Sequence, residues 1–139
     1  MVDNQALYDR PNFFQAYLTL PRSQNGLEGA PEWPTLREMV GNITDQRVLD
    51  LGCGLGWFSR YASNSGAHSV DTSDISAKML GRAKEMNETH QKINIRYELK
   101  DLATVKLTTE EYDLAYSSLV LHYLANDAFG RLLREVLNR

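Results

Sequence analysis

Cysteine is almost absent from this chain, because Cys53 is the single thiol among 139 residues. One thiol cannot form an internal disulfide, and the sequence offers no set of metal ligands that could be completed around it. A fold held together by disulfides is therefore excluded. We expect no metal site, and a reducing, cytoplasmic environment fits this cysteine content.

Long apolar stretches and clusters of basic residues are also missing. No apolar run approaches the roughly 18 residues of a membrane-spanning helix, and no basic and apolar leader opens the chain. The 15 Lys and Arg residues are outnumbered by 18 Asp and Glu residues, which gives a net charge of -3 at pH 7. We therefore expect neither a membrane protein nor a nucleic-acid-binding protein, since the latter carries a basic surface.

The chain has the length of one compact domain, and its first forty residues differ in pattern from the rest. Apolar residues from Phe13 to Leu20 follow helical spacing, and the segment Pro21 to Pro34 is rich in residues that break helices. Pro34 fits the first turn of a short helix that closes near Gly41. These patterns predict a helical N-terminal segment over residues 1–41, with a folded-over loop at 21–34, and a core over residues 42–139.

Strand and helix patterns alternate along that core. The predicted order is a strand at 47–51, a helix at 57–65, a strand at 67–73, a helix capped by Ser76, a strand over Ile93, Ile95 and Tyr97, a strand at 112–121, and a helix ending near Leu137. Such alternation predicts an α/β fold with a parallel sheet covered by helices on both faces. Ligands of these sheets bind beyond the carboxyl ends of the strands.

The turn after the first predicted strand contains Gly52, Gly54 and Gly56. Glycine allows positive φ and close approach of a ligand to the backbone, so the spacing indicates a loop that holds a nucleoside cofactor; a plain tight turn is the alternative. A dinucleotide fingerprint, G-x-G-x-x-G, needs a small residue where this chain has Trp57, which weakens but does not eliminate binding of NAD or FAD. A phosphate-binding G-x-x-x-x-G-K-[ST] loop is absent.

Asp74 ends the second predicted strand, one strand-helix unit after the glycine loop. A carboxylate there can accept two hydrogen bonds from a ribose diol. The alternative is an acid that stabilises the N-terminus of the following helix. The neighbouring glycine loop favours the ribose role, because the ends of adjacent parallel strands meet at one edge of the sheet.

Four blocks together resemble the class I S-adenosylmethionine-dependent methyltransferases. The blocks are Val48 to Gly56, Asp74 to Leu80, Lys100 to Leu102 and Tyr112 to Leu119, and Gly26 to Trp33 is similar to the N-terminal part of a branch that acts on small molecules. The resemblance implies a Rossmann-like, three-layer αβα fold. It also implies S-adenosyl-L-methionine as the cofactor and a small molecule as the methyl acceptor.

The resemblance implies roles at the methionine end of the cofactor. The backbone of Gly52, Cys53 and Gly54 would contact the methionine part, Asp50 would orient the loop or the ammonium group, and Ser117 would lie near the methionine end. Each role has a structural alternative: Cys53 is then simply a small residue, and Ser117 simply the end of a strand.

At the adenosine end, the resemblance implies that Asp74 holds the ribose hydroxyls and that Ile75 covers one face of the adenine. Asp101 would accept a hydrogen bond from the adenine amino group, and the backbone N–H of Leu102 would donate to the ring. The structural alternatives are a core role for Ile75 and a turn-forming carboxylate at Asp101.

Three further residues are candidates at the edges of the site. In the resembling branch the N-terminal helix folds over the cofactor, so Tyr17 and Arg22 would cap its carboxylate; a packed tyrosine and a solvated arginine are the alternatives. His122 follows the fourth strand, where the acceptor would approach, and is a candidate for proton transfer; a structural histidine is the alternative. A sulfonium methyl is already activated, so no covalent catalyst is required.

The resembling family usually has seven strands, whereas this sequence provides the first four and ends within the helix after strand four. The expected sheet order is 3-2-1-4, which makes strand four an edge that invites pairing with another chain. We therefore expect a homo-oligomer formed through that edge or through the final helix. Three functions remain open: a small-molecule methyltransferase, a cofactor-binding module without turnover, and a nucleotide-dependent oxidoreductase.

Overall fold

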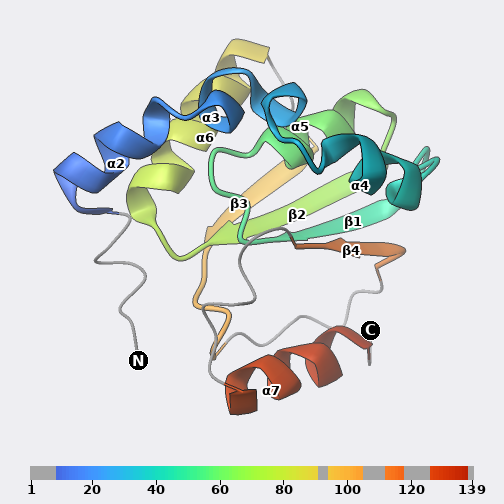
Figure 1. The fold of residues 1–139 in the computed structure, drawn as a ribbon. Helices are drawn as coiled ribbons and strands as arrows, with labels where there is room; N and C mark the ends of the chain where they lie inside the picture. The colour runs from blue at the N-terminus through green and yellow to red at the C-terminus, as the bar shows by residue number, and fades with distance from the viewer. Residues whose placement is uncertain (1–8, 91–93, 105–111, 118–125, 138–139) are drawn as a thin grey trace.

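A computed structural model describes residues 9–90, 94–104, 112–117 and 126–137, and within them a parallel sheet of four strands with helices on both faces (Figure 1). The strands are β1 (Arg47–Leu51), β2 (Ser69–Asp74), β3 (Ile95–Leu99) and β4 (Leu114–Tyr116). They lie in the order β3-β2-β1-β4, and every neighbouring pair is parallel. The predicted α/β class and 3-2-1-4 order are confirmed.

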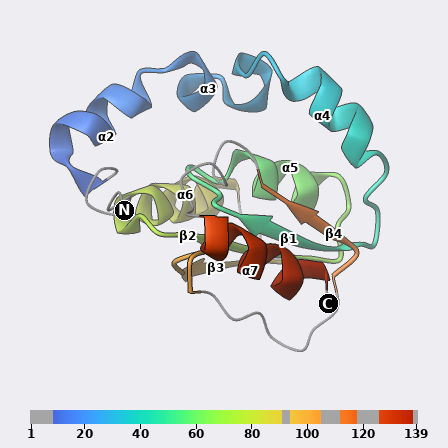
Figure 2. The same cartoon turned by 60° about the horizontal axis from the view of Figure 1, so that its bottom comes forward.

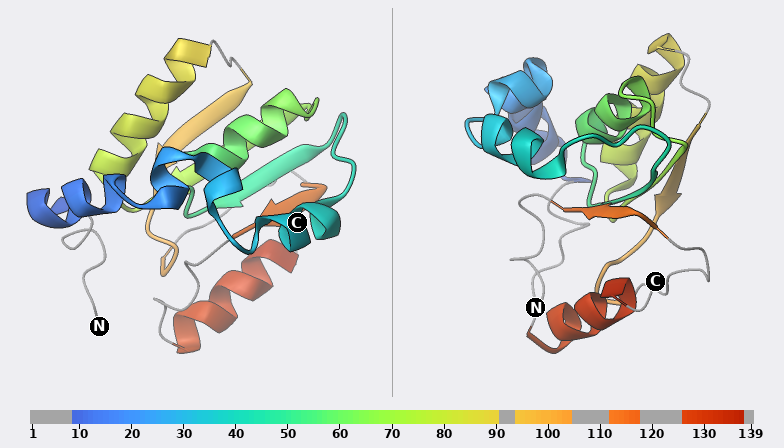
Figure 3. Two further views of the ribbon diagram at one scale, coloured as in Figure 1. Left: turned by 45° about the horizontal axis from the view of Figure 1, so that its top comes forward. Right: turned by 90° about the vertical axis from the view of Figure 1, so that its right-hand side faces the viewer.

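Helices cover both faces of this sheet. Helices α5 (Trp57–Asn64) and α6 (Ala77–His90) lie on one face, and α7 (Asn126–Leu137) lies on the other (Figures 1 and 3). The crossovers β1-α5-β2 and β2-α6-β3 place α5 and α6 on the same face because such connections share one hand. The arrangement is the predicted three-layer αβα sandwich. In the described part of the chain, no helix is both long and apolar enough to cross a membrane.

Alternation along β1 divides the core into two layers. Val48 belongs to the cluster that includes Phe58 and Ala62 of α5. Leu49 and Leu51 belong to a second cluster with Leu132 of α7. Successive strand residues point to opposite faces, so one buried strand supplies both layers. This central position of β1 fixes the place of the glycine loop that follows it.

The N-terminal segment consists of short helices: α2 (Pro11–Leu18), α3 (Pro21–Gln24), the 3₁₀ helix η1 (Gly26–Gly29) and α4 (Trp33–Val40). They form an arch beside the layer of α5 and α6 (Figure 2). Trp33 of α4 is 3% exposed and makes edge-to-face contacts with Phe58 and Tyr61 of α5, with ring centroids 6.2 and 4.8 Å away. Helix α4 is therefore anchored in the main core through Trp33.

The predicted loop at 21–34 is wrong in detail, because α3 and η1 lie within it. Pro21 occupies the first turn of α3, where its fixed φ suits a helix start. Gly29 permits close packing, since a Cβ there would lie 2.3 Å from the carbonyl oxygen of Pro21. A Cβ on Gly26 would lie 2.6 Å from the ring of Trp57. These glycines let helical turns pack closely.

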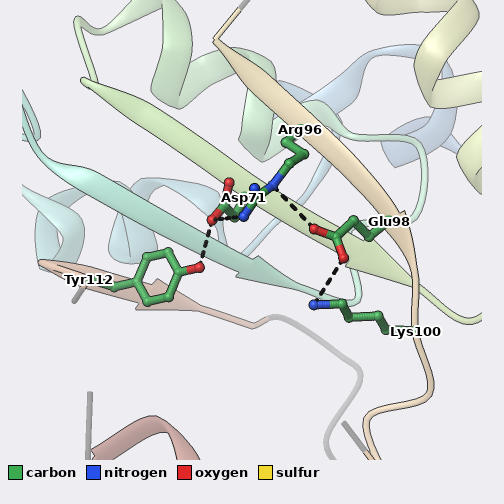
Figure 4. Close-up of polar contacts among 5 residues, drawn as sticks. All are labelled: Asp71, Arg96, Glu98, Lys100 and Tyr112. Atoms are coloured by element: carbon green, nitrogen blue, oxygen red, sulfur yellow. Dashed lines mark hydrogen bonds and ion pairs between the residues drawn. The ribbon is translucent and has the colours of Figure 1, made fainter. Parts of the chain in front are cut away.

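Polar side chains occupy the face of β2 and β3 that lies on the α7 side of the sheet (Figure 4). Asp71 accepts hydrogen bonds from Arg96 at 2.8 Å and from the hydroxyl of Tyr112 at 2.6 Å. Glu98 continues the network to Arg96 at 3.2 Å and to Lys100 at 3.1 Å. The acidic and basic side chains of this face are paired with one another. The apolar contacts of α7 are made with β1 instead.

Some predicted boundaries changed. The fourth strand was predicted at 112–121, but β4 covers Leu114–Tyr116, and residues 118–125 lie outside the described part of the chain. Ile93 also lies outside it, while Ile95 and Tyr97 are in β3 as predicted. The predicted cap on α6 is confirmed, because the Ser76 hydroxyl accepts a hydrogen bond from the Met79 N–H at 3.2 Å.

Candidate functional site

The glycine loop is fastened to the end of the neighbouring strand. The backbone N–H groups of Gly52 and Cys53 both donate to the carbonyl oxygen of Ser73 in β2, each at 2.9 Å. Gly52, Gly54 and Gly56 have φ values of 76°, 55° and 78°, in the left-handed region that favours glycine. The loop therefore has a backbone path that side-chain-bearing residues would strain.

Gly54 offers open space over its backbone. Among the residues that the structure describes, and apart from the neighbours of Gly54 in the chain, the one atom within 4 Å of a Cβ built on Gly54 is the hydroxyl oxygen of Tyr17, at 3.7 Å. Tyr17 belongs to α2, so the N-terminal segment reaches the glycine loop. Its role as a cover over the cofactor stays a prediction. The space that a side chain would fill fits a ligand that lies against the backbone, below the Tyr17 hydroxyl.

Gly56 has the opposite surroundings. A Cβ there would lie 2.9 Å from Nη1 of Arg60 and 3.2 Å from the Cβ of Ala83 in α6. Arg60 is 4% exposed, and its guanidinium lies 4.8 Å from the ring centroid of Trp57. Gly56 is thus a packing position, where α5 begins close against α6.

We expect Gly56→Ala to lower the free energy of unfolding by about 1–3 kcal/mol, because it combines a left-handed φ with overpacking. Urea unfolding measures this change. Gly81→Ala is the matched control: Gly81 lies in α6, and no atom of the described residues would lie within 4 Å of a Cβ there. Alanine there should raise stability by up to about 1 kcal/mol. Equal stability of wild type and Gly56→Ala would contradict the packing role.

Asp74 connects the glycine loop to the turn before α6. The side chain is 8% exposed; Oδ2 accepts the N–H of Gly54 at 2.8 Å, and Oδ1 accepts the N–H of Ser76 at 2.9 Å. Burial raises the pKa of Asp74, and these backbone hydrogen bonds oppose that rise. Each carboxylate oxygen keeps a further lone pair, so Asp74 can still accept hydrogen bonds from two ligand hydroxyls. Both interpretations of Asp74, as helix cap and as ribose ligand, are compatible with this geometry.

Asp50 lies inside β1 beneath the loop. It is 2% exposed, and Oδ2 accepts the hydroxyl hydrogen of Ser59 in α5 at 2.7 Å. Burial raises the pKa of Asp50 to about 7, against the lowering effect of the Ser59 hydrogen bond, and the negative charge of Asp74 adds to the rise. The carboxyl group therefore changes charge near neutral pH.

Cys53 is half-buried, with its sulfur 3.6 Å from the carbonyl oxygen of Gly54. Burial raises the pKa of the Cys53 thiol, with further increases from the charges of Asp50 and Asp74. The thiol is therefore protonated at neutral pH and is not activated as a nucleophile.

Ser117 lies at the carboxyl end of β4. Its hydroxyl donates to the carbonyl oxygen of Leu51 at 3.0 Å. Because β4 is parallel to β1, the two strand ends lie together. The structure therefore brings Ser117, Asp50, Asp74, Gly54 and Tyr17 to one edge of the sheet.

Other predicted site residues have different surroundings. Arg22 donates to Glu32 at 2.7 Å, within the N-terminal segment. Asp101 is exposed and accepts a hydrogen bond from the N–H of Ala103 at 2.9 Å. This is the contact expected of a turn-forming carboxylate, the structural alternative to a contact with adenine. The side chain of Leu102 is 8% exposed and packs in the core cluster of α7.

The last two candidate site residues are Ile75 and His122. Ile75 is half-buried in the turn between Asp74 and Ser76. His122 lies outside the described residues, so its role in proton transfer stays a prediction. Among the residues that the structure describes, no group of three or more His, Cys, Asp or Glu side chains could hold a metal ion.

Sequence reasoning missed Ser59 and Asp9. Ser59 donates to Asp50 from the first turn of α5, and Asp9 accepts from Ser76 across 67 positions of the chain. An acid and a serine nine residues apart form no general motif. The signal for Ser59 was a small polar residue directly after the apolar residues Trp57 and Phe58, which open the helix.

A family model described as "Methyltransferase domain" matches residues 48–139. An uncharacterised protein of Haemophilus influenzae is 32% identical over 124 residues, which cover 87% of this chain and 49% of that protein. The malonyl-[acyl-carrier protein] O-methyltransferase of Salmonella typhimurium is 35% identical over 91 residues, 64% of this chain and 34% of that enzyme. The chain thus spans about half or less of the length of these relatives.

Solved structures show the same fold. A crystal structure of an S-adenosylmethionine-dependent methyltransferase from Mesorhizobium loti is 43% identical, with a TM-score of 0.72 over 80% of this chain and 50% of that one. Another, from Listeria monocytogenes, is 33% identical, with a TM-score of 0.62 over 75% of this chain and 48% of that one.

Proposed function

Because the chain belongs to the family of methyltransferase domains, we propose that it binds S-adenosyl-L-methionine and transfers the methyl group to a small-molecule acceptor. One observation carries the proposal: Asp74 holds the backbone of Gly54 at the carboxyl ends of β1 and β2, beneath the hydroxyl of Tyr17. A carboxylate and a glycine-rich loop are the two features needed to hold an adenosyl group at this edge.

The residues of the site would bind and orient rather than react. The cofactor, when bound, supplies an activated methyl group on a sulfonium. Asp74 would accept from the ribose hydroxyls, and the backbone of Gly52 to Gly54 would lie against the methionine part. Tyr17 would help to exclude water from above. Alignment of the reacting atoms is the main contribution required from the chain.

The ionisation of Asp50 would depend on the positive charge of the cofactor. A buried carboxyl group with a pKa of about 7 becomes an anion more readily when a cation lies nearby. An ammonium group close to the glycine loop would therefore favour the ionised form of Asp50. The hydrogen bond from Ser59 keeps this carboxylate in place.

Calorimetric titration with S-adenosylhomocysteine and with NAD tests the cofactor. We expect saturable binding of S-adenosylhomocysteine and none of NAD. Binding of NAD instead would favour the oxidoreductase alternative, and binding of neither would overturn the proposal.

A turnover assay separates an enzyme from a binding module. Transfer of labelled methyl groups is measured against a panel of small acceptors. The panel includes a malonyl thioester, because the Salmonella relative is named for that acceptor class. Transfer to one acceptor supports the enzyme, while cofactor binding with no transfer to any acceptor supports the binding module.

We also propose that the protein works as a homo-oligomer in the cytoplasm, with a small molecule as its other partner. Among the described strands, β4 is hydrogen-bonded to β1 alone, and Leu133 and Leu137 of α7 are 41% and 81% exposed. An unpaired strand edge and an apolar helix stripe both favour association. Light scattering at micromolar concentration should give a mass above that of the monomer; a monomer alone contradicts this proposal.

A further inference from the structure

Asp9, which precedes α2, reaches the turn between β2 and α6. Its Oδ1 accepts the hydroxyl hydrogen of Ser76 at 2.6 Å and lies 3.3 Å from the donating backbone N–H of Lys78. Ser76 is fully buried. The first N–H groups of a helix lack partners within the helix and favour a negative charge. Asp9 thus caps α6 from a distant part of the chain.

Two more contacts follow along α2. The ammonium of Lys78 lies 5.9 Å from the ring centroid of Phe14, and the hydroxyl of Tyr17 lies beside Gly54. Figures 1 and 3 show α2 next to the start of α6. The helix therefore extends from the start of α6 to the glycine loop.

Asp74 connects the same two segments, the glycine loop and the turn before α6. Asp74 accepts from Gly54 in the glycine loop and from Ser76 in the turn before α6. The segment from Asp9 to Tyr17 joins them again from outside. A ligand that Asp74 holds between them would consequently lie under α2.

The residues of α2 are only partly buried. None of its residues is buried, and Phe13 is 36% exposed. Burial of apolar area is the usual source of helix docking, and a short hydrogen bond to a charged group adds to it here. The contact between Asp9 and Ser76 is the fastening at the α6 end.

We propose that Asp9 is a positioning residue whose bond to Ser76 holds α2 closed over the cofactor site and sets the rate of cofactor exchange. This inference rests on the proposed function, since the exchanging molecule is the cofactor. The contact joins two groups of the protein and includes no atom of the ligand, so loosening it should speed both entry and release. The equilibrium affinity should then change much less than either rate.

Surface plasmon resonance with S-adenosylhomocysteine tests this in wild type, Asp9→Ala and a control. Loss of one charge-assisted hydrogen bond predicts that Asp9→Ala raises both the association and the dissociation rate about tenfold, with the dissociation constant changed less than about threefold. The control is Asp127→Ala, which removes an exposed acid from the first turn of α7. Its rates should stay within about twofold of wild type.

Unchanged rates in Asp9→Ala would overturn the inference. A slower association with a faster dissociation would also overturn it, because that pattern indicates a damaged binding site. If wild type does not bind S-adenosylhomocysteine, the proposed function fails instead, and hydrogen exchange of the ligand-free protein tests the contact by itself. Asp9→Ala should then speed exchange of the amides in residues 11–18, and equal protection in both proteins would overturn the fastening role.

Discussion

Asp74→Ala is expected to weaken binding of S-adenosylhomocysteine by at least about 100-fold. The substitution would remove two charge-assisted hydrogen bonds to the ribose, each of about 1.5–3 kcal/mol. It also leaves the N–H groups of Gly54 and Ser76 without their carboxylate partner, so the glycine loop loses its fastening to the turn before α6. Calorimetric titration measures the affinity.

The matched control for this experiment is Asp71→Ala, on the same strand. Asp71 points to the opposite face of the sheet and pairs with Arg96. The control removes the same charge from β2 while leaving the glycine loop untouched, so its affinity should stay within about twofold of wild type. An Asp74→Ala protein that is folded and binds as tightly as wild type would show that Asp74 is only a helix cap.

The second large effect concerns Asp50 and the dependence of stability on pH. The pKa of Asp50 is about 7 in the folded chain against the ordinary 3.8. Between these values the unfolded chain has released the proton and the folded chain retains it, so the free energy of unfolding falls as pH rises from about 4 to about 7 and then levels. The total loss from this group is about 4 kcal/mol.

Urea unfolding at a series of pH values checks this prediction. Asp50→Asn keeps an acceptor for the Ser59 hydroxyl but cannot ionise, so its stability should change much less between pH 5 and pH 8. The pKa of Asp74 is also raised, so Asp74 also lowers the free energy of unfolding as pH rises. This contribution remains in the Asp50→Asn variant. A wild-type slope that persists unchanged in Asp50→Asn would show that Asp50 does not hold a proton in the folded protein.

The arrangement of the sheet could be predicted because it depends on local patterns. Apolar strands and amphipathic helices alternate from Arg47 onward, which predicts a parallel sheet covered by helices. The order 3-2-1-4 was implied by the family resemblance. The glycine loop and the cap at Ser76 are short motifs with a physical cause, and both are present. The family resemblance rests on the same blocks.

Contacts between distant positions could not be predicted. The bonds from Asp9 to Ser76 and from Arg22 to Glu32 depend on how the N-terminal helices lie on the core, which no periodicity specifies. The helices α3 and η1 arose where glycine was interpreted as a breaker, because tertiary packing decides between a loop and a close contact. The ligand roles of Ile75, Asp101, Leu102 and Ser117 remain predictions, since the ligand itself would define them.

The indole of Trp33 sits within the main core although it comes from the N-terminal segment. A chain that lacks residues 1–41 would therefore lose part of its core, because the rings of Phe58 and Tyr61 would lose their contacts with Trp33. The N-terminal segment and the sheet should consequently fold together, and removal of residues 1–41 should destabilise the sheet as well as uncover the site.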